Sequence, residues 1–240
     1  MSGHSKWNNI KHKKEKSDAA KAKIFTKIGK EMAVAIKAGG PDPNNNSRLR
    51  DLIAKAKANN VPNDNIQRTI KKFTESNDIN YEEIVYEGYG PSGVAIIVET
   101  STDNRNRTAG NVRAAFSKYG GNLGQNGCVG FLFEEKGVIT IVDEDEEISE
   151  DKIMEDALEC GAEDIKCDEG EYTIYTAPDD FDAVREAIIG LGYKLETADL
   201  AKVPSTYVTL GEEDAENMEK MLDKFNEDDD VNAVYHNWDM

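Results

Sequence analysis

The chain has 240 residues, of which 32% are charged, and its mean hydropathy is −0.65. It has no apolar run near the roughly 18 residues that a membrane span needs. The basic N-terminus MSGHSKWNNIKHKKEK is not followed by an apolar stretch, so it does not read as a secretory signal. These features argue against membrane and secreted classes and predict a soluble cytoplasmic protein. Three cysteines without framework spacing, Cys128, Cys160 and Cys167, fit reduced thiols.

Charge is distributed very unevenly along the chain. The formal net charge is −18, which taken whole argues against nucleic acid as a partner. Residues 1–80, however, hold 17 Lys and Arg against 8 Asp and Glu, a net charge of +9, and residues 81–240 carry −27. This reversal predicts a basic region for polyanions and an acidic remainder that repels phosphate.

Residues 1–16 have no periodic apolar face and are predicted to form an extended basic arm. Clustered cations suit phosphate contact, because each neutralised phosphate releases counterions. Trp7 is suited to stacking on an unpaired base, although a lone tryptophan is more often a packing residue. The candidate nucleic-acid-binding residues of the arm are Lys6, Trp7, Lys11, His12, Lys13, Lys14 and Lys16. The alternative is a merely solvated run of charge.

Three amphipathic helices are predicted next, at 17–38, at 47–58 and from Asn63, which we expect to cap the third. The glycine pair Gly39–Gly40 is expected to end the first helix. Apolar residues recur at helical spacing, and cations occupy the outer faces. With the arm, the helices define a basic domain over 1–78. Its further candidate contacts are Lys23, Lys27, Lys30, Arg48, Arg68, Lys71 and Lys72.

After residue 80 the apolar pattern changes to a period of two, which is typical of strands. A hairpin is predicted over 81–89 and 93–100, followed by a helix at 104–119 and a strand at 128–134. Residues 137–202 then read as β-α-β-β-α-β, the ferredoxin-like order, with elements at 137–142, 150–161, 163–167, 171–176, 179–192 and 193–200. A strand at 203–210, a helix at 212–225 and a strand at 231–236 follow.

These elements predict an α+β fold with a three-helix N-terminal domain and two α/β domains. Residues 79–136 and 203–240 would form one discontinuous α/β domain, because the last three elements complete the first four. Residues 137–202 would form a ferredoxin-like α/β domain inserted into it.

The segment STDNRNRT (101–108) places Arg105 and Arg107 at a predicted helix start. Arginine there opposes the helix dipole, so the pair points to a bound anion or an acidic partner. Ion pairing with neighbouring carboxylates explains the arginines equally well.

The glycine-rich stretch at 120–130 follows a helix and precedes a strand, the reverse of a dinucleotide fingerprint, and lacks the Lys-Ser/Thr of a P-loop. A helix C-cap with a flexible loop is the favoured interpretation, and a contact with protein or RNA stays open. The acidic run 143–147 does not fit a calcium loop, because Ile148 replaces the required glycine.

Neither a metal-binding spacing among the histidines nor a nucleophile elbow is present. We therefore expect no enzymatic activity, catalytic residue, metal, cofactor or small-molecule substrate.

Several strings taken together resemble the YebC family of bacterial regulators, which has a mitochondrial relative that activates translation of cytochrome c oxidase. They are GHSKWNNIKHKK (3–14), KIFTKIGKE (23–31), YEGYGPSG (86–93), DNRNRT (103–108), FSKYGGNLG (116–124), VPSTYV (203–208) and VYHN (234–237). The resemblance runs in order from residue 3 to about 237. It implies a helical N-terminal domain, two α/β domains and a regulatory role, with no accepted catalytic residues.

The resemblance leaves two targets open. Bacterial members are commonly labelled transcriptional regulators that bind promoter DNA. Others look like ribosome-associated factors that ease translation of proline-rich stretches, for which the target would be ribosomal RNA, and ribosomal proteins would be possible partners. The leading hypothesis is a nucleic-acid-binding regulator of transcription, with ribosome-associated regulation of translation as the alternative. A protein-interaction adaptor, whose basic face binds acidic protein, is the rival from another class.

Overall fold

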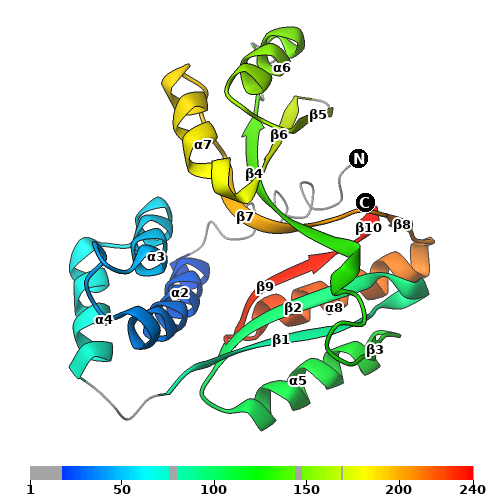
Figure 1. The fold of residues 1–240 in the computed structure, drawn as a ribbon. Coiled ribbons are helices and arrows are strands. Elements are labelled where there is room, and N and C mark those ends of the chain that lie inside the picture. The colour runs from blue at the N-terminus through cyan, green and yellow to red at the C-terminus, as the bar shows by residue number, and fades with distance from the viewer. Residues whose placement is uncertain (1–17, 76–79, 144–147, 169, 240) are drawn as a thin grey trace. The chain divides into compact units, whose positions relative to one another are not determined.

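The computed structural model describes residues 18–75, 80–143, 148–168 and 170–239 (Figure 1). Helices and antiparallel sheets make up these residues, so the fold belongs to the mixed α+β class that the sequence predicts. The described chain divides into two compact units. The first holds residues 18–130 and 208–238, and the second holds residues 131–207 with Asp239.

Three helices of the first unit form a small bundle: α2 (Asp18–Gly39), α3 (Ser47–Ala58) and α4 (Asn63–Glu75). Their apolar faces meet in one core, as the periodicity predicts. Its buried residues are Ile28, Met32, Ala35, Ile36, Leu49, Leu52, Ala56, Ile66 and Ile70. The helix α2 ends at the expected glycine pair, because Gly40 adopts a φ of +84° and its N–H donates to Ile36 O.

The buried Asn46 joins two of these helices. Its Oδ1 accepts from the backbone N–H of Leu49 at 3.0 Å and so caps α3. Its Nδ2 donates to the carbonyls of Ala35 and Gly40, both at 2.8 Å, near the end of α2. The cap predicted for the third helix is wrong by one position, since Asn63 is the first residue of α4.

The sheet of the first unit has the strand order β3-β1-β2-β9, with every neighbouring pair antiparallel. Its strands are β3 (Asn122–Leu123), β1 (Glu82–Tyr89), β2 (Ala95–Thr102) and β9 (Val231–His236). The helices α5 (Arg105–Lys118) and α8 (Glu212–Glu227) pack on each other and on this sheet (Figure 1). Phe116 and Phe225 meet edge to face there, with ring centroids 5.4 Å apart. The helix α2 also contacts β2 and β9.

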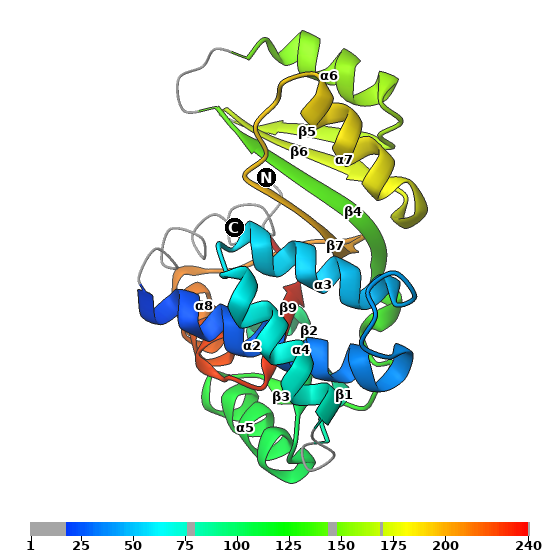
Figure 2. The same ribbon diagram turned by 90° about the vertical axis from the view of Figure 1, so that its left-hand side faces the viewer.

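The second unit contains the sheet β5-β6-β4-β7, again antiparallel throughout. Its elements follow the predicted β-α-β-β-α-β order: β4 (Phe133–Val142), α6 (Glu150–Glu159), β5 (Asp164–Asp168), β6 (Glu171–Thr176), α7 (Phe181–Gly190) and β7 (Thr197–Pro204). Both helices pack on the sheet (Figure 2), and Ile153 of α6 and Val184 of α7 share a core with Ile139 and Ile174.

Some predicted bounds need correction. The strand predicted at 128–134 begins only at Phe133, after a short 3₁₀ helix, Gly130–Leu132. The strand predicted at 203–210 is divided, because β7 ends at Pro204 and β8 is Val208–Thr209, which pairs with β10 (Trp238–Asp239). The predicted domain limits at 136/137 and 202/203 lie within β4 and β7. The division into three domains stays a prediction.

Candidate nucleic-acid interface

Seven predicted contacts lie before residue 18, outside the part of the chain that the structure describes. They are Lys6, Trp7, Lys11, His12, Lys13, Lys14 and Lys16. The other predicted cations come from α2, α3 and α4, and the structure divides them into two groups.

Three lysines along one side of α2 are hydrogen-bonded to the end of α8 and to the segment that joins α8 to β9. We call residues 226–230, which are the last two residues of α8 and the three that follow, the acidic loop, because they read Asn-Glu-Asp-Asp-Asp. Each lysine reaches a backbone carbonyl: Lys23 Nζ lies 2.6 Å from Glu227 O, Lys27 Nζ 3.1 Å from Asn226 O, and Lys30 Nζ 2.8 Å from Asp229 O. The carbonyls of Asn226 and Glu227 end α8, where cations also interact favourably with the helix dipole.

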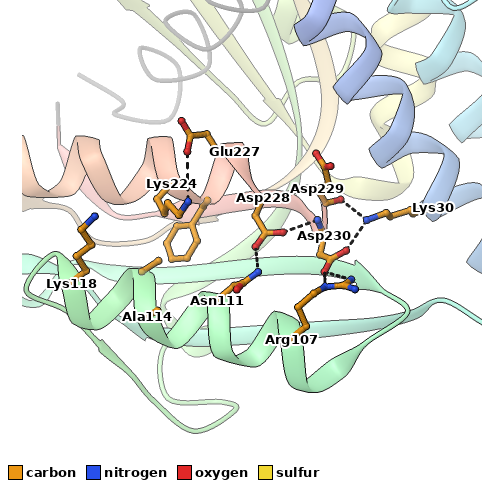
Figure 3. A pocket seen from close by; sticks show the side chains of 12 residues that line it. Lys30, Arg107, Asn111, Ala114, Lys118, Lys224, Glu227, Asp228, Asp229 and Asp230 are labelled. Atoms are coloured by element: carbon orange, nitrogen blue, oxygen red, sulfur yellow. Dashed lines mark hydrogen bonds and ion pairs between the residues drawn. The ribbon is translucent and has the colours of Figure 1, made fainter.

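The centre of this contact is Asp230, which is only 3% exposed. Lys30 donates to its Oδ1 at 2.6 Å, and Arg107 donates to its Oδ2 at 2.7 Å (Figure 3). Thr108 also donates to Oδ2, at 2.8 Å. Burial by itself would raise the pKa of Asp230, but the hydrogen bonds from Lys30, Arg107 and Thr108 outweigh it and lower the pKa to about 2. Asp230 is therefore an ionised carboxylate shared by α2, α5 and the acidic loop.

Arg107 has a structural reason to stand at the start of α5. Its guanidinium donates to Asp103 at 2.8 Å as well as to Asp230, and these bonds raise the pKa of Arg107. Asn104 caps the helix by accepting from the N–H of Arg107 at 3.1 Å. The structure therefore shows the ion pairing that was one of the two explanations for this arginine, and a partner or anion contact of Arg107 stays a prediction. The side chain of Arg105 is exposed, and its role as a partner or anion contact stays a prediction.

The predicted cations of α3 and α4 are exposed, and their internal contacts lie at the surface. Arg48 pairs with Glu83, and Lys71 Nζ lies 3.8 Å from Glu75. Lys72 Nζ lies 5.3 Å from the ring centroid of Phe73. Exposed contacts of this kind contribute little to stability, so the fold does not depend on them.

Two more exposed cations of α3 belong with this group and were not among the predicted contacts, namely Arg50 and Lys57. The charge count over residues 1–80 already contained them, and helical spacing placed both away from the apolar stripe. We call the combined set the outer cations: Arg48, Arg50, Lys57, Arg68, Lys71 and Lys72.

A groove of about 520 Å³ lies beside the acidic loop, between α5 and α8 (Figure 3). Its lining includes Asn111 and Lys118 of α5, Lys224 of α8, and Asp228, whose carboxylate accepts from Asn111 Nδ2 at 3.0 Å. Cations and carboxylates both line it, so it has no single charge preference. Sequence reasoning missed this groove because Asn111 and Asp228 are 117 positions apart.

The glycine-rich stretch is more constrained than the flexible loop that the sequence predicts. The buried carboxylate of Glu87 accepts from the backbone N–H groups of Gly127, Val129 and Gly130, at 2.7–2.8 Å. The predicted C-cap is present, since Gly120 has a φ of +80°. These three backbone donors are thus used inside the protein, and the stretch is held in place by Glu87.

Among the described residues, no group of three His, Cys, Asp or Glu side chains is placed to hold a metal ion. Within the same part of the chain, no helix is both long and apolar enough to cross a membrane. Cys128, Cys160 and Cys167 are free thiols, and burial raises the pKa of each.

Comparison with known proteins places these features in a family. Residues 81–238 match the family model described as TACO1/YebC second and third domain, and residues 5–76 match the TACO1/YebC protein N-terminal domain. A relative from Clostridium botulinum (strain Eklund 17B / Type B) is 57% identical over 239 residues, which cover 99% of this chain and 96% of the relative. One from Lachnoclostridium phytofermentans is 54% identical over 241 residues, which cover all of both chains. Each is named a probable transcriptional regulatory protein.

The crystal structure of a conserved hypothetical protein from Aquifex aeolicus is also similar. It superposes with a TM-score of 0.81 at 44% sequence identity, and the match covers 92% of this chain and 91% of that one. The likeness extends to the mixed α+β fold described above. With the two family models and the relatives that match over their full length, it leads to one conclusion: the chain belongs to the TACO1/YebC family.

Proposed function

We propose that this protein is a cytoplasmic, non-enzymatic regulator of gene expression that binds duplex DNA through its basic N-terminal region. The contacts would come from the outer cations and from the arm at residues 6–16. Residues 1–78 would act as the binding domain, while the acidic α/β part, with 137–202 inserted between 79–136 and 203–240, would restrict where the protein settles.

The observation that carries the proposal is the exposure of the outer cations on α3 and α4. They stand on a region of net charge +9 in a chain whose remainder carries −27. If these cations served only to solvate a helix face, there would be no reason for the net charge to be positive here and strongly negative in the rest of the chain. The names of the bacterial relatives, probable transcriptional regulatory proteins, favour DNA as the target.

A second candidate is regulation of translation through ribosomal RNA. The charge of −27 over residues 81–240 favours it, because an acidic surface complements the basic proteins of a ribosome, whereas on naked DNA it only repels phosphate. In this reading the basic region would hold RNA phosphates, and the acidic part would contact ribosomal proteins.

Salt dependence tests the phosphate contacts. The full chain should bind a duplex of about 20 base pairs with an affinity that falls linearly in a log-log plot against salt. Changing Arg68, Lys71 and Lys72 together to Ala should reduce the slope by about 2.7, or about 0.9 for each lost contact. The matched control is Lys152→Ala, Arg185→Ala and Lys194→Ala, which makes the same change of charge in the second unit and should leave the slope unchanged. Equal slopes for all three proteins would refute the proposal.

Sedimentation of a lysate through a sucrose gradient separates the two targets. Migration with ribosomes, lost on ribonuclease treatment and unchanged by deoxyribonuclease, would favour the translational reading. Recovery with DNA, lost on deoxyribonuclease treatment, would favour the transcriptional one. Binding that survives both nucleases would identify the protein as an adaptor between proteins.

A further inference from the structure

The lysine row of α2 faces oxygen atoms of the chain itself, in a pattern that resembles a nucleic-acid backbone. Lys23, Lys27 and Lys30 lie on one side of the helix and span about 10 Å along its axis. The acidic loop meets them with three carbonyl oxygens and the carboxylate of Asp230. A strand of nucleic acid would offer the same ammonium groups a row of phosphate oxygens.

We infer that the acidic loop is an internal competitor for nucleic acid: it occupies the α2 lysines in the free protein and releases them when phosphates replace it. This inference rests on the proposed function, because it concerns regulation of the same basic region. It assigns to residues 226–230 the role of an electrostatic latch that weakens non-specific binding.

The contact is built so that opening it leaves no buried charge without a partner. When Lys30 leaves, the carboxylate of Asp230 still accepts from Arg107 at 2.7 Å and from Thr108 at 2.8 Å. These two donors come from α5 and not from α2, so they stay with the loop. Without these two donors, opening would leave a buried carboxylate unpaired, which costs a large free energy.

The two ends of the latch differ in exposure. At the outer end, 31% of the Lys23 side chain and 63% of the Asp229 side chain are exposed, and the charged groups lie 3.9 Å apart. At the inner end, 12% of the Lys30 side chain is exposed. Water already reaches the outer pair, where exchange of carboxylate for phosphate changes little in energy. Opening would therefore begin at Lys23 and proceed toward Lys30.

Variants of the full chain test the latch. Asp230→Asn removes the buried carboxylate that accepts from Lys30. The double change Glu227→Gln with Asp229→Asn lowers the negative charge of the exposed end, where the Asp229 carboxylate lies 3.9 Å from Lys23, without touching the core. We expect both to bind a 20-base-pair duplex and a single-stranded RNA of equal length more tightly at low salt. The salt slope on DNA should steepen by about 0.9 for each lysine released. For a fourfold rise in salt, each extra contact then costs about 3.5-fold in affinity.

The control distinguishes release of lysines from a general loss of negative charge. Glu212→Gln with Glu213→Gln makes the same change of charge as the exposed double variant, but in the first turn of α8. A gain in this control equal to that of Glu227→Gln with Asp229→Asn would overturn the latch. Should Asp230→Asn fail to fold by circular dichroism, the exposed double variant decides the matter.

The lysines complete a double-mutant cycle. Changing Lys23, Lys27 and Lys30 together to Gln should alter duplex affinity less than threefold in the otherwise unchanged chain, and should cancel the gain in the latch variants. Two outcomes overturn the inference. A large loss of affinity in the lysine variant of the unchanged chain would show that the lysines are already free, and unchanged binding by the latch variants would show that the lysines never engage phosphate.

If the outer-cation variant loses affinity while the latch variants change nothing, the proposed function stands without the latch. Absence of binding by every protein, at about 50 mM salt, overturns both.

Discussion

The α2 lysines and the outer cations belong to the same basic helical bundle, yet they differ in burial and in hydrogen bonding. Lys23, Lys27 and Lys30 donate to the acidic loop at 2.6–3.1 Å, and the centre of that contact is buried. The outer cations, such as Lys71, are exposed and make only surface contacts. Net charge therefore identifies a basic region, but the location of counter-charges decides which of its cations are available to a partner.

Within the buried contact, replacing Asp230 should reduce the stability of the fold most. Changing Asp230 to Ala should lower the free energy of unfolding by about 3–5 kcal/mol, because Lys30 and Arg107 both lose a desolvated partner. Urea unfolding followed by circular dichroism measures it. Asp229→Ala, one residue away and exposed, should stay within about 0.5 kcal/mol. Similar losses for the two variants would contradict the distinction.

Acid should weaken the same contact selectively. The pKa of Asp230 in the folded chain, about 2, lies below its ordinary value, so its contribution is complete above that ordinary value and is lost as the pH falls toward 2. We expect about 2 kcal/mol of the stability difference between the unchanged chain and Asp230→Asn to disappear between pH 5 and pH 2. Taking the difference between the two proteins removes the contribution of other carboxylates. A difference that is independent of pH would show that Asp230 is not held as an ion.

The lysines themselves give a smaller contrast. Lys30→Ala should cost about 1.5–3 kcal/mol, because a charged hydrogen bond to a buried carboxylate is lost, although Arg107 keeps that carboxylate paired. The matched change Lys71→Ala on α4 should alter stability by at most about 0.5 kcal/mol. Thermal melting of both variants tests the comparison, and an equal shift would place Lys30 among the surface cations.

The smallest effect distinguishes the two ends of the lysine row. Lys23→Ala should cost less than about 1 kcal/mol, and the cost should vanish in about 1 M salt, where screening acts over about 3 Å. The cost of Lys30→Ala should persist in the same salt, since buried pairs are screened much less. If salt removes both costs alike, the row has no buried end.

Much of the architecture could be predicted from the sequence because its causes are local. The glycine pair at 39–40 ends α2, and the apolar run Ala95–Val98, which follows the turn at 90–93, favours the buried strand β2 that pairs with β1. The order β-α-β-β-α-β of the second unit follows from period changes alone. The less accurate bounds lie where chain segments meet, as at β7, whose extent depends on pairing with β4.

The candidate site is different, because charge is countable in a sequence but its pairing is not. Sequence reasoning placed the α2 lysines on an outer face, which follows from helical spacing. Only the tertiary structure brings residues 226–230 onto that face, across about 200 positions of the chain. The same holds for Arg107. Its unfavourable position relative to the helix dipole is visible in the sequence, but the carboxylate of Asp230 that compensates for it lies 123 residues away along the chain. Helical periodicity is a property of neighbours along the chain, whereas the environment of a charge depends on whichever oxygen atoms the fold brings beside it.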